Sequence, residues 1–318
     1  MMFAARGIAI SCSVFLLVYC VLSLGVCLGW RRVWWHSQGY SARRIANLLF
    51  ALRMSPLAAA VVVTAVFTVP SFLVFEPRAI DEPMGAMALS FGSLGAALGI
   101  FGALNMGLAV GRAGRAISAW TRAAQPVGAT AVPVLRVASS IPAMVTAGIF
   151  HPRILLSGAA ESVLSVQELE AALNHEAAHV RQRDNLKKLL LRLVAFPGMA
   201  GLEAAWHEAS EMAADEAAAS NAAEALDLAG ALIKLSRMAQ VASPAELTAA
   251  LLHGAGPVSA VHARVERLIA WSEFHQRSRR NYSAWYGLAV AIAAIAVFSI
   301  TYGQLLVRVH AATEWLVR

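Results

Sequence analysis

Four stretches of the chain carry almost no charged side chains and are long enough to cross a membrane. They cover about residues 7–29, 57–75, 86–110 and 284–306. A helix needs about 20 apolar residues to cross roughly 30 Å of hydrocarbon. The pattern therefore predicts four transmembrane helices. Most ionisable side chains fall between the third and the fourth stretch, which predicts a polar domain over residues 112–283.

The second and third predicted spans contain residues that soluble helices tend to avoid. Pro70 lies in the second span, where we expect it to kink the helix, as membrane helices tolerate. Glycines recur in and just before the third span, and their small size allows helices to pack closely in lipid. These are Gly85, Gly92, Gly95, Gly99, Gly102 and Gly107. The alternative for these two spans is a buried hydrophobic hairpin of a soluble protein.

The polar domain begins with short β-type runs and continues with amphipathic helices. The runs are Val132–Val137, Ala143–Ala147 and Arg153–Leu156, separated by proline and glycine. Ser165 and Glu168 form a capping box that predicts the start of a helix, and Pro197–Gly198 ends it. Further helices are expected over about 202–220, 223–240 and 258–275. The predicted fold class is therefore mainly α, with a small β-sheet in the polar domain.

Composition and charge add an orientation to this picture. Of 318 residues, 58% are hydrophobic and 14% are charged, with a formal net charge of +7. Short basic segments beside membrane spans stay in the cytoplasm, so we expect the N-terminus outside and the 112–283 domain inside. Because the arginines flank the spans, we expect a lipid bilayer as partner and no direct contact with nucleic acid. They are Arg31, Arg32, Arg43, Arg44 and Arg53, then Arg112, Arg115 and Arg122, then Arg277, Arg279 and Arg280.

The three cysteines do not change this interpretation. Cys12, Cys20 and Cys27 all lie in the first apolar stretch. There they behave as small apolar side chains, and their spacing indicates neither a disulfide framework nor a cysteine-rich metal site.

The strongest chemical signal lies inside the capped helix. His175 and His179 are four residues apart, so both imidazoles lie on one helix face and reach the same metal ion. Glu176 projects beside them, where it is placed to take a proton from a water molecule that the metal activates. The alternative is a pair of solvated histidines on an ordinary helix. The pattern favours a catalytic zinc site.

A catalytic zinc also needs a third protein ligand and an open position. Glu211, on the following predicted helix, completes a set of two histidines and a glutamate. His207 lies one turn earlier on the same face and competes with it, and spacing alone leaves both open. Asp215, one turn after Glu211, is placed to accept a hydrogen bond from a ligand histidine.

Residues 143–270 resemble membrane-bound gluzincin peptidases, in particular the BlaR/MecR-type family (metallopeptidase family 56). They are similar, more distantly, to the HtpX and CAAX-protease family. The resemblance rests on residues 152–157 (PRILLS), 164–173 (LSVQELEAAL), 175–184 (HEAAHVRQRD) and 211–215 (EMAAD). The layout of three spans, a zinc domain and a fourth span also resembles the β-lactam sensor-transducers.

The resemblance implies roles for individual residues. It implies zinc as the cofactor and favours Glu211 over His207 as the third ligand. It further implies that Ala143–Gly148 is an edge strand that pairs with the substrate backbone, although a purely structural strand is the alternative. Arg264 corresponds to an arginine that faces the site and stabilises the oxyanion, unless it is an ordinary surface arginine. Asp184 corresponds to a structural residue near the end of the metal helix.

The function implied is zinc-dependent cleavage of a cytosolic or membrane-proximal protein. By resemblance the enzyme lies in a bacterial plasma membrane, crosses it several times and has its catalytic domain in the cytoplasm. A transcriptional repressor of the BlaI type is the substrate that the resemblance suggests, in signal transduction. The alternatives are an HtpX-like protease for membrane-protein quality control, and a receptor or scaffold that holds zinc without cleaving.

Overall fold

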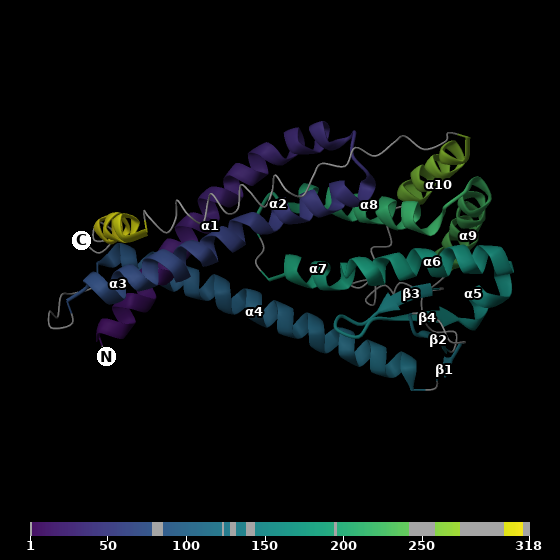
Figure 1. The fold of residues 1–318 in the computed structure, drawn as a ribbon. Helices are drawn as coiled ribbons and strands as arrows, with labels where there is room; N and C mark the ends of the chain where they lie inside the picture. Colours follow the sequence, from purple (N-terminus) through teal and green to yellow (C-terminus); the bar gives the residue numbers. More distant parts are fainter. Residues whose placement is uncertain are drawn as a thin grey trace.

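The molecule is elongated, with a bundle of long helices at one end and a smaller domain of helices and strands at the other (Figure 1). It is seen in a computed structural model that describes residues 2–77, 85–122, 124–127, 132–137, 144–193, 196–241, 258–273 and 302–313. We call the second part, β1–β4 with α5–α10, the mixed domain.

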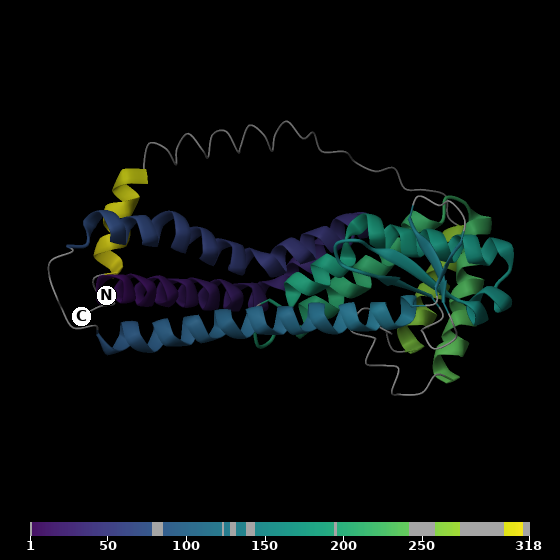
Figure 2. The same cartoon turned by 90° about the horizontal axis from the view of Figure 1, so that it is seen from below.

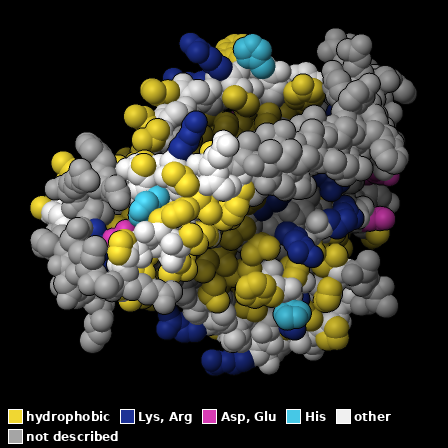
Figure 3. Space-filling view, turned by 60° about the vertical axis from the view of Figure 1, so that its left-hand side comes forward, with side chains coloured by type: hydrophobic (Ala, Val, Ile, Leu, Met, Phe, Trp, Pro, Cys, Tyr) yellow, Lys and Arg dark blue, Asp and Glu magenta, His cyan; other side chains and the backbone are white. Residues whose placement is uncertain are grey.

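The bundle consists of α1 (Met2–Ser37), α2 (Ala42–Val62), a π-helical segment η1 (Val63–Thr68), α3 (Val69–Phe75) and α4 (Ala86–Thr121). Three continuous helices, Phe3–Ser37, Ala42–Phe75 and Ala86–Thr121, are long and apolar enough to cross a membrane. Hydrophobic side chains cover much of the described surface seen from the bundle end (Figure 3). The first three predicted spans thus fall within apolar helices, as expected for a chain that must satisfy its backbone hydrogen bonds in lipid.

Pro70 is preceded by π-helical turns, and the helix continues beyond it to Phe75. A proline lacks the N–H that would bond the carbonyl four residues earlier, which here belongs to Val66. The Tyr302 hydroxyl donates to that Val66 oxygen at 2.8 Å. Where we expected a kink, the structure has a π-helical segment within one continuous helix, Ala42–Phe75, and the Val66 carbonyl is satisfied by another part of the chain.

The basic segment 30–55, between the first two predicted spans, is helical apart from a short turn at 38–41. α1 runs to Ser37 and α2 begins at Ala42, well before the predicted start of the second span at residue 57. The first turns of α2 bury Ile45, Ala46 and Leu49 against α8 (Ala200–Ala218). Apolar residues between the arginines account for this, because they give the segment a buried helical face.

The predicted fourth span, 284–306, lies almost entirely outside the described residues. Only its last five positions belong to the helical segment 302–313. That segment lies at the end of the bundle opposite the mixed domain, beside α3 (Figure 1). Ring contacts of Phe67 with Tyr302 and of Phe75 with His310 hold it there.

Close packing between α1 and α4 depends on two of the glycines noted in the sequence. A Cβ added at Gly92 would lie 2.7 Å from the Ala9 carbonyl oxygen, and one at Gly95 would collide with the Cys12 carbonyl oxygen. Figure 2 shows the two helices side by side at the end of the bundle that holds the N-terminus. The two helices therefore approach until their backbones are almost in contact.

The sheet of the mixed domain has the strand order β1-β2-β4-β3. β1 (Gln125–Pro126) is antiparallel to β2 (Val134–Val137), β2 is parallel to β4 (Arg153–Ser157), and β4 is antiparallel to β3 (Met144–Ala147). Alternate residues face opposite sides of a sheet. Met144, Ile154 and Leu156 pack toward the helices of the domain, whereas Val145 and Leu155 pack on Ile117 and Trp120 of α4.

The helices of the mixed domain follow the predicted pattern with one exception. α6 (Val166–Gln182), α8, α9 (Ala222–Val241) and α10 (Val258–Glu273) lie where we expected them, and a short α5 (Gly158–Val163) precedes α6. The first predicted helix is broken at Arg183, whose φ of 54° is left-handed, and α7 (Asp184–Leu191) follows. The break turns Asp184 back toward α6, so it serves the site described below.

An ion pair between a buried arginine and a half-exposed glutamate joins the bundle to α8. The Arg53 side chain of α2 is only 2% exposed, and its Nε donates to Glu203 Oε1 at 2.8 Å. Its Nη2 lies 3.5 Å from the Leu191 carbonyl oxygen. A buried arginine is costly unless it is paired, so these contacts fix where α2, α7 and α8 meet.

The α1–α4 contact can be tested with alanine at two glycines of the same helix. Gly95→Ala forces α1 and α4 apart, and we expect it to cost about 1–3 kcal/mol, the usual range for overpacking. Gly99 has no atom within 4 Å of an added Cβ, so Gly99→Ala is the control and should be neutral or slightly stabilising. Thermal unfolding in detergent measures both, and equal melting temperatures would contradict the close contact.

Candidate metal centre

α6 carries the two histidines and begins at a complete capping box. The Ser165 hydroxyl accepts from the Glu168 backbone N–H at 3.2 Å, and Glu168 accepts from the Ser165 N–H at 2.7 Å. This fixes the start of the helix and therefore the direction of every later side chain. His175 and His179, 6% and 7% exposed, both lie on the buried face of α6.

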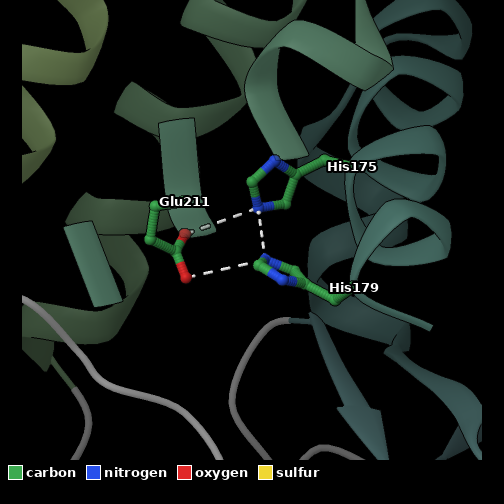
Figure 4. Close-up of side chains that lie close together, drawn as sticks. All are labelled: His175, His179 and Glu211. Atoms are coloured by element: carbon green, nitrogen blue, oxygen red, sulfur yellow. Dashed lines mark hydrogen bonds and ion pairs between the residues drawn. The ribbon is translucent and has the colours of Figure 1, made fainter. Parts of the chain in front are cut away.

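α8 brings the third side chain to this face. Glu211 Oε2 lies 3.6 Å from His175 Nε2, and Glu211 Oε1 lies 3.5 Å from His179 Nε2. The two Nε2 atoms are 3.1 Å apart. Figure 4 shows both imidazoles pointing toward the Glu211 carboxylate from the neighbouring helix. We call these three residues the His-His-Glu cluster.

The cluster fits a single metal ion. One potential ligand atom from each residue lies within 4.8 Å of the other two. Two imidazole nitrogens and a carboxylate oxygen are donors that divalent transition metals accept. Among the residues that the structure describes, this is the one group of three or more histidine, cysteine and acidic side chains with such spacing.

Carboxylates lie behind both imidazoles, on the side away from the cluster. Asp184 Oδ2 is 2.7 Å from His179 Nδ1, and Lys187 donates to the other oxygen of Asp184 at 3.4 Å. Asp215 Oδ1 lies 3.0 Å from His175 Nδ1, although the angle is not that of a regular hydrogen bond. Such outer carboxylates orient ligand imidazoles and leave Nε2 available to a metal.

Arg264 of α10 reaches the same site and is not an ordinary surface arginine. Its Nε and Nη2 donate to the two Asp215 oxygens at 2.9 and 2.6 Å, a bidentate pair. Its Nη1 lies 3.0 Å from Glu211 Oε2, and its Nη2 lies 3.4 Å from His175 Nε2. The Arg264 side chain is 16% exposed. The guanidinium therefore links the carboxylate of the cluster with the carboxylate behind it.

These contacts shift the pKa values of the buried groups. Burial lowers the pKa of His179, but its contacts with Asp184 and Glu211 outweigh burial and raise that pKa to about 10. Burial likewise opposes the rise in the pKa of His175 that Asp215 and Glu211 produce. Burial raises the pKa of Asp215, but the charge and hydrogen bonds of Arg264 have the larger effect and lower that pKa to about 2. The pKa of Glu211 lies well below its usual range, because the two histidines outweigh burial.

Glu176 is held by the strand next to α6. The Thr146 hydroxyl of β3 lies 2.7 Å from Glu176 Oε2 and 3.2 Å from the Glu176 carbonyl oxygen. The Glu176 charge acts on both His179 and Arg264. Glu176 is only 6% exposed, so its carboxylate lies at the buried edge of the cluster.

His207, the competing ligand, lies beside the cluster. Its Nδ1 is 4.0 Å from Glu211 Oε1, and its side chain is 27% exposed. Spacing alone left Glu211 and His207 open as the third ligand. The structure places the Glu211 carboxylate near both imidazoles. His207 is one turn away, where it contacts the carboxylate from the side.

Three residues near the site were missed from sequence. Glu203 is one of four polar positions spaced by four along α8, with His207, Glu211 and Asp215, and this stripe was a usable signal. Thr146 is the one polar residue of β3. Asn185 donates to the carbonyl oxygens of Thr146 and Gly148, both at 3.0 Å. Nothing in the sequence around Asn185 indicated this contact.

Comparisons with protein-family models, with curated proteins and with solved structures give no match for the chain. The resemblance to membrane gluzincins therefore remains a prediction from the motifs. A functional assignment therefore depends on the geometry of the site.

Glu211 and His207 can be distinguished by metal binding. We expect Glu211→Ala to weaken zinc binding by more than the roughly 10–100-fold typical of losing a partner outside the ligand set. His207→Ala keeps all three donors and should retain zinc nearly as well as the unaltered protein. Metal content after dialysis and competition with a chelator measure both variants. The opposite ranking would show that His207 is the ligand.

Zinc binding should also depend on pH in a defined direction. Because the pKa of His179 is raised to about 10 in the metal-free protein, its imidazole is protonated at neutral pH. A metal must displace that proton, so affinity should rise with pH, by about tenfold per unit for each proton released, and level off near pH 10. Calorimetry at pH 7.5 in buffers of different ionisation enthalpy measures the release. Binding without proton release would contradict the assignment.

Proposed function

We propose that the protein is a membrane-bound zinc-dependent endopeptidase. The observation that carries the proposal is the convergence of His175, His179 and Glu211, with a further carboxylate, Glu176, at the edge of the same cluster. A purely structural metal site has no need of an additional acid. A hydrolytic site needs a base beside the metal.

Zinc is the metal that suits the cluster best. Two histidines and one glutamate form the three-ligand set of catalytic zinc sites, in which a further position stays open. Bound there, zinc would act as a Lewis acid toward water and toward a peptide carbonyl group. Asp184 and Asp215 support this assignment, since outer carboxylates raise the basicity of ligand imidazoles.

Glu176 is the general base in this proposal. Its carboxylate accepts the proton of the attacking water and then passes it to the leaving amine. Thr146 holds one of its oxygens at 2.7 Å, which fixes the rotamer of the side chain. A base that is held in place needs no reorganisation during the reaction.

Arg264 is the group that stabilises negative charge. Its guanidinium is fixed by two hydrogen bonds to Asp215 and lies 3.0 Å from Glu211 Oε2. A buried, preoriented cation of this kind favours an oxyanion that forms beside the cluster. Because Asp215 also lies against His175, the same contacts keep that imidazole oriented.

The substrate we propose is a protein at the inner face of a membrane. Three apolar helices support membrane anchoring, and the mixed domain is attached to the end of that bundle (Figure 1). The exposed basic residues at the ends of α1 and α4 favour a cytoplasmic position for the domain. A transcriptional repressor of the BlaI type is one candidate, and damaged membrane proteins are another.

The base can be tested with a charge-neutral variant. Glu176→Gln keeps the size of the side chain and all three ligands, so zinc content should be unchanged. Cleavage of a fluorescence-quenched library of extended peptides by the full-length protein in detergent should fall by at least about 100-fold, the usual contribution of a general base.

Glu170→Gln, on an exposed position of the same helix, is the matched control and should cut at the unaltered rate. Equal rates for Glu176→Gln and Glu170→Gln would rule out Glu176 as the base. Absence of cleavage in the zinc-loaded, unaltered protein would contradict the peptidase proposal itself.

A further inference from the structure

The turn between α7 and α8 is the part of the mixed domain that enters the helix bundle. α7 contacts both α2 and α4, and it runs back from α6 toward the bundle (Figure 1). The chain then reverses its direction, and α8 leads away again. We call residues 192, 193 and 196–199, which lie between the two helices, the α7–α8 turn.

The apolar side chains of this turn pack inside the bundle. Leu193 and Phe196 belong to one hydrophobic cluster with Tyr19 of α1 and Leu98 of α4. The rings of Phe196 and Tyr19 meet edge to face, with their centres 5.9 Å apart. The turn is therefore enclosed by helices that are apolar enough to cross a membrane.

The two bundle residues of this cluster lie deep in their apolar stretches. Tyr19 is near the middle of 7–29, and Leu98 is in the middle of 86–110. Each is about 10–12 residues from the ends of its stretch, which is roughly 15–18 Å along a helix. Half the hydrocarbon thickness of a bilayer is also about 15 Å. In a bundle that spans the membrane, the turn therefore reaches well below the lipid surface.

The carbonyl groups around the turn have partners from the bundle. Cys27 Sγ of α1 lies 3.7 Å from the Pro197 carbonyl oxygen. Arg53 Nη2 of α2 lies 3.5 Å from the carbonyl oxygen of Leu191, the last residue of α7. Non-helical backbone is tolerated at membrane depth only where protein groups take the place of water. These contacts meet that condition.

The composition of the turn favours lipid over water around it. Residues 189–199 are apolar apart from Arg192, whereas turns in water are typically rich in polar residues. Arg192 is exposed, and its long side chain lets the charged group extend toward the lipid headgroups. A soluble domain that docked on the outside of the bundle would gain nothing from so apolar a turn.

We infer that the α7–α8 turn is inserted in the bilayer, which it enters from the side of the mixed domain and leaves without crossing. Its partners are α1, α2 and α4 on one side and lipid acyl chains on the other. The inference rests on the membrane-bound part of the proposed function and does not depend on peptidase activity.

Insertion of the turn places the metal centre close to the membrane surface. Glu211 is 11 residues after Ala200, where α8 begins, and this is about 16 Å along a helix. α7, which starts at Asp184 beside His179, ends at the same turn. Both ligand-bearing segments therefore lead directly into the inserted turn, and a polypeptide reaches the His-His-Glu cluster beside the lipid headgroups.

The test places one fluorescent label at a time on the full-length protein in lipid vesicles. Serine replaces the three native cysteines, and a polarity-sensitive nitrobenzoxadiazole dye is attached to a single introduced cysteine. Pro197→Cys carries the label of the turn. Leu104→Cys on α4 is the lipid control and Leu226→Cys on α9 is the water control. All three positions are exposed among the residues that the structure describes.

Two quenchers then distinguish lipid from water around the label. We expect lipids brominated in the middle of their acyl chains to cause the same loss of emission at positions 197 and 104, and none at 226. Iodide in the aqueous phase should quench position 226 alone. Ala200→Cys, also exposed, provides a second label beside the turn and should behave as Pro197→Cys does.

The outcomes separate the inserted turn from membrane anchoring. Iodide quenching at 197 and 200, with position 104 quenched by brominated lipid, overturns the insertion and leaves the bundle in the membrane. Labels at 197 and 200 that neither quencher reaches are enclosed by protein, which overturns the contact with lipid. Iodide quenching at 104 as well overturns the membrane-bound part of the proposed function.

Discussion

The docking of α8 is the constraint on which the rest of the structure depends. One face of this helix packs on α2 through Leu202, Trp206 and Ala209 and is pinned there by the Arg53–Glu203 pair. Further along, the helix presents Glu211 to α6. The position of the Glu211 carboxylate is therefore set by contacts with the apolar helices of the bundle as well as by the mixed domain. A shift of the bundle against α8 would move this carboxylate relative to His175 and His179.

The site itself is held together by alternating charges that are shielded from water. Each imidazole lies between two carboxylates, and Arg264 bridges the Asp215 and Glu211 carboxylates. Buried charges of this kind are tolerated only when every member is paired. A divalent ion held by the cluster would add positive charge at the centre and would replace protons on the imidazoles, so metal binding would be coupled to the protonation of the site.

Much of this arrangement followed from local sequence patterns, and the rest depended on tertiary contacts. Hydrophobic stretches predicted three of the helices in the bundle, and the capping box at Ser165 predicted the start of α6 and the shared face of His175 and His179. Glu211 and His207 lie on the same face of α8, so their spacing could not show which of them meets the histidines. That depends on where α8 crosses α6, which is a tertiary contact. The left-handed break at Arg183 and the long, helical α1 and α2 were missed, because residues distant in sequence stabilise them.

X-ray absorption spectroscopy of the zinc-loaded, full-length protein tests the central claim most directly. We expect two imidazole nitrogens and a carboxylate oxygen at about 2.0–2.2 Å from zinc, and the loss of one imidazole contribution in His179→Ala. A spectrum without imidazole scattering, or one that His179→Ala leaves unchanged, would show that zinc binds elsewhere.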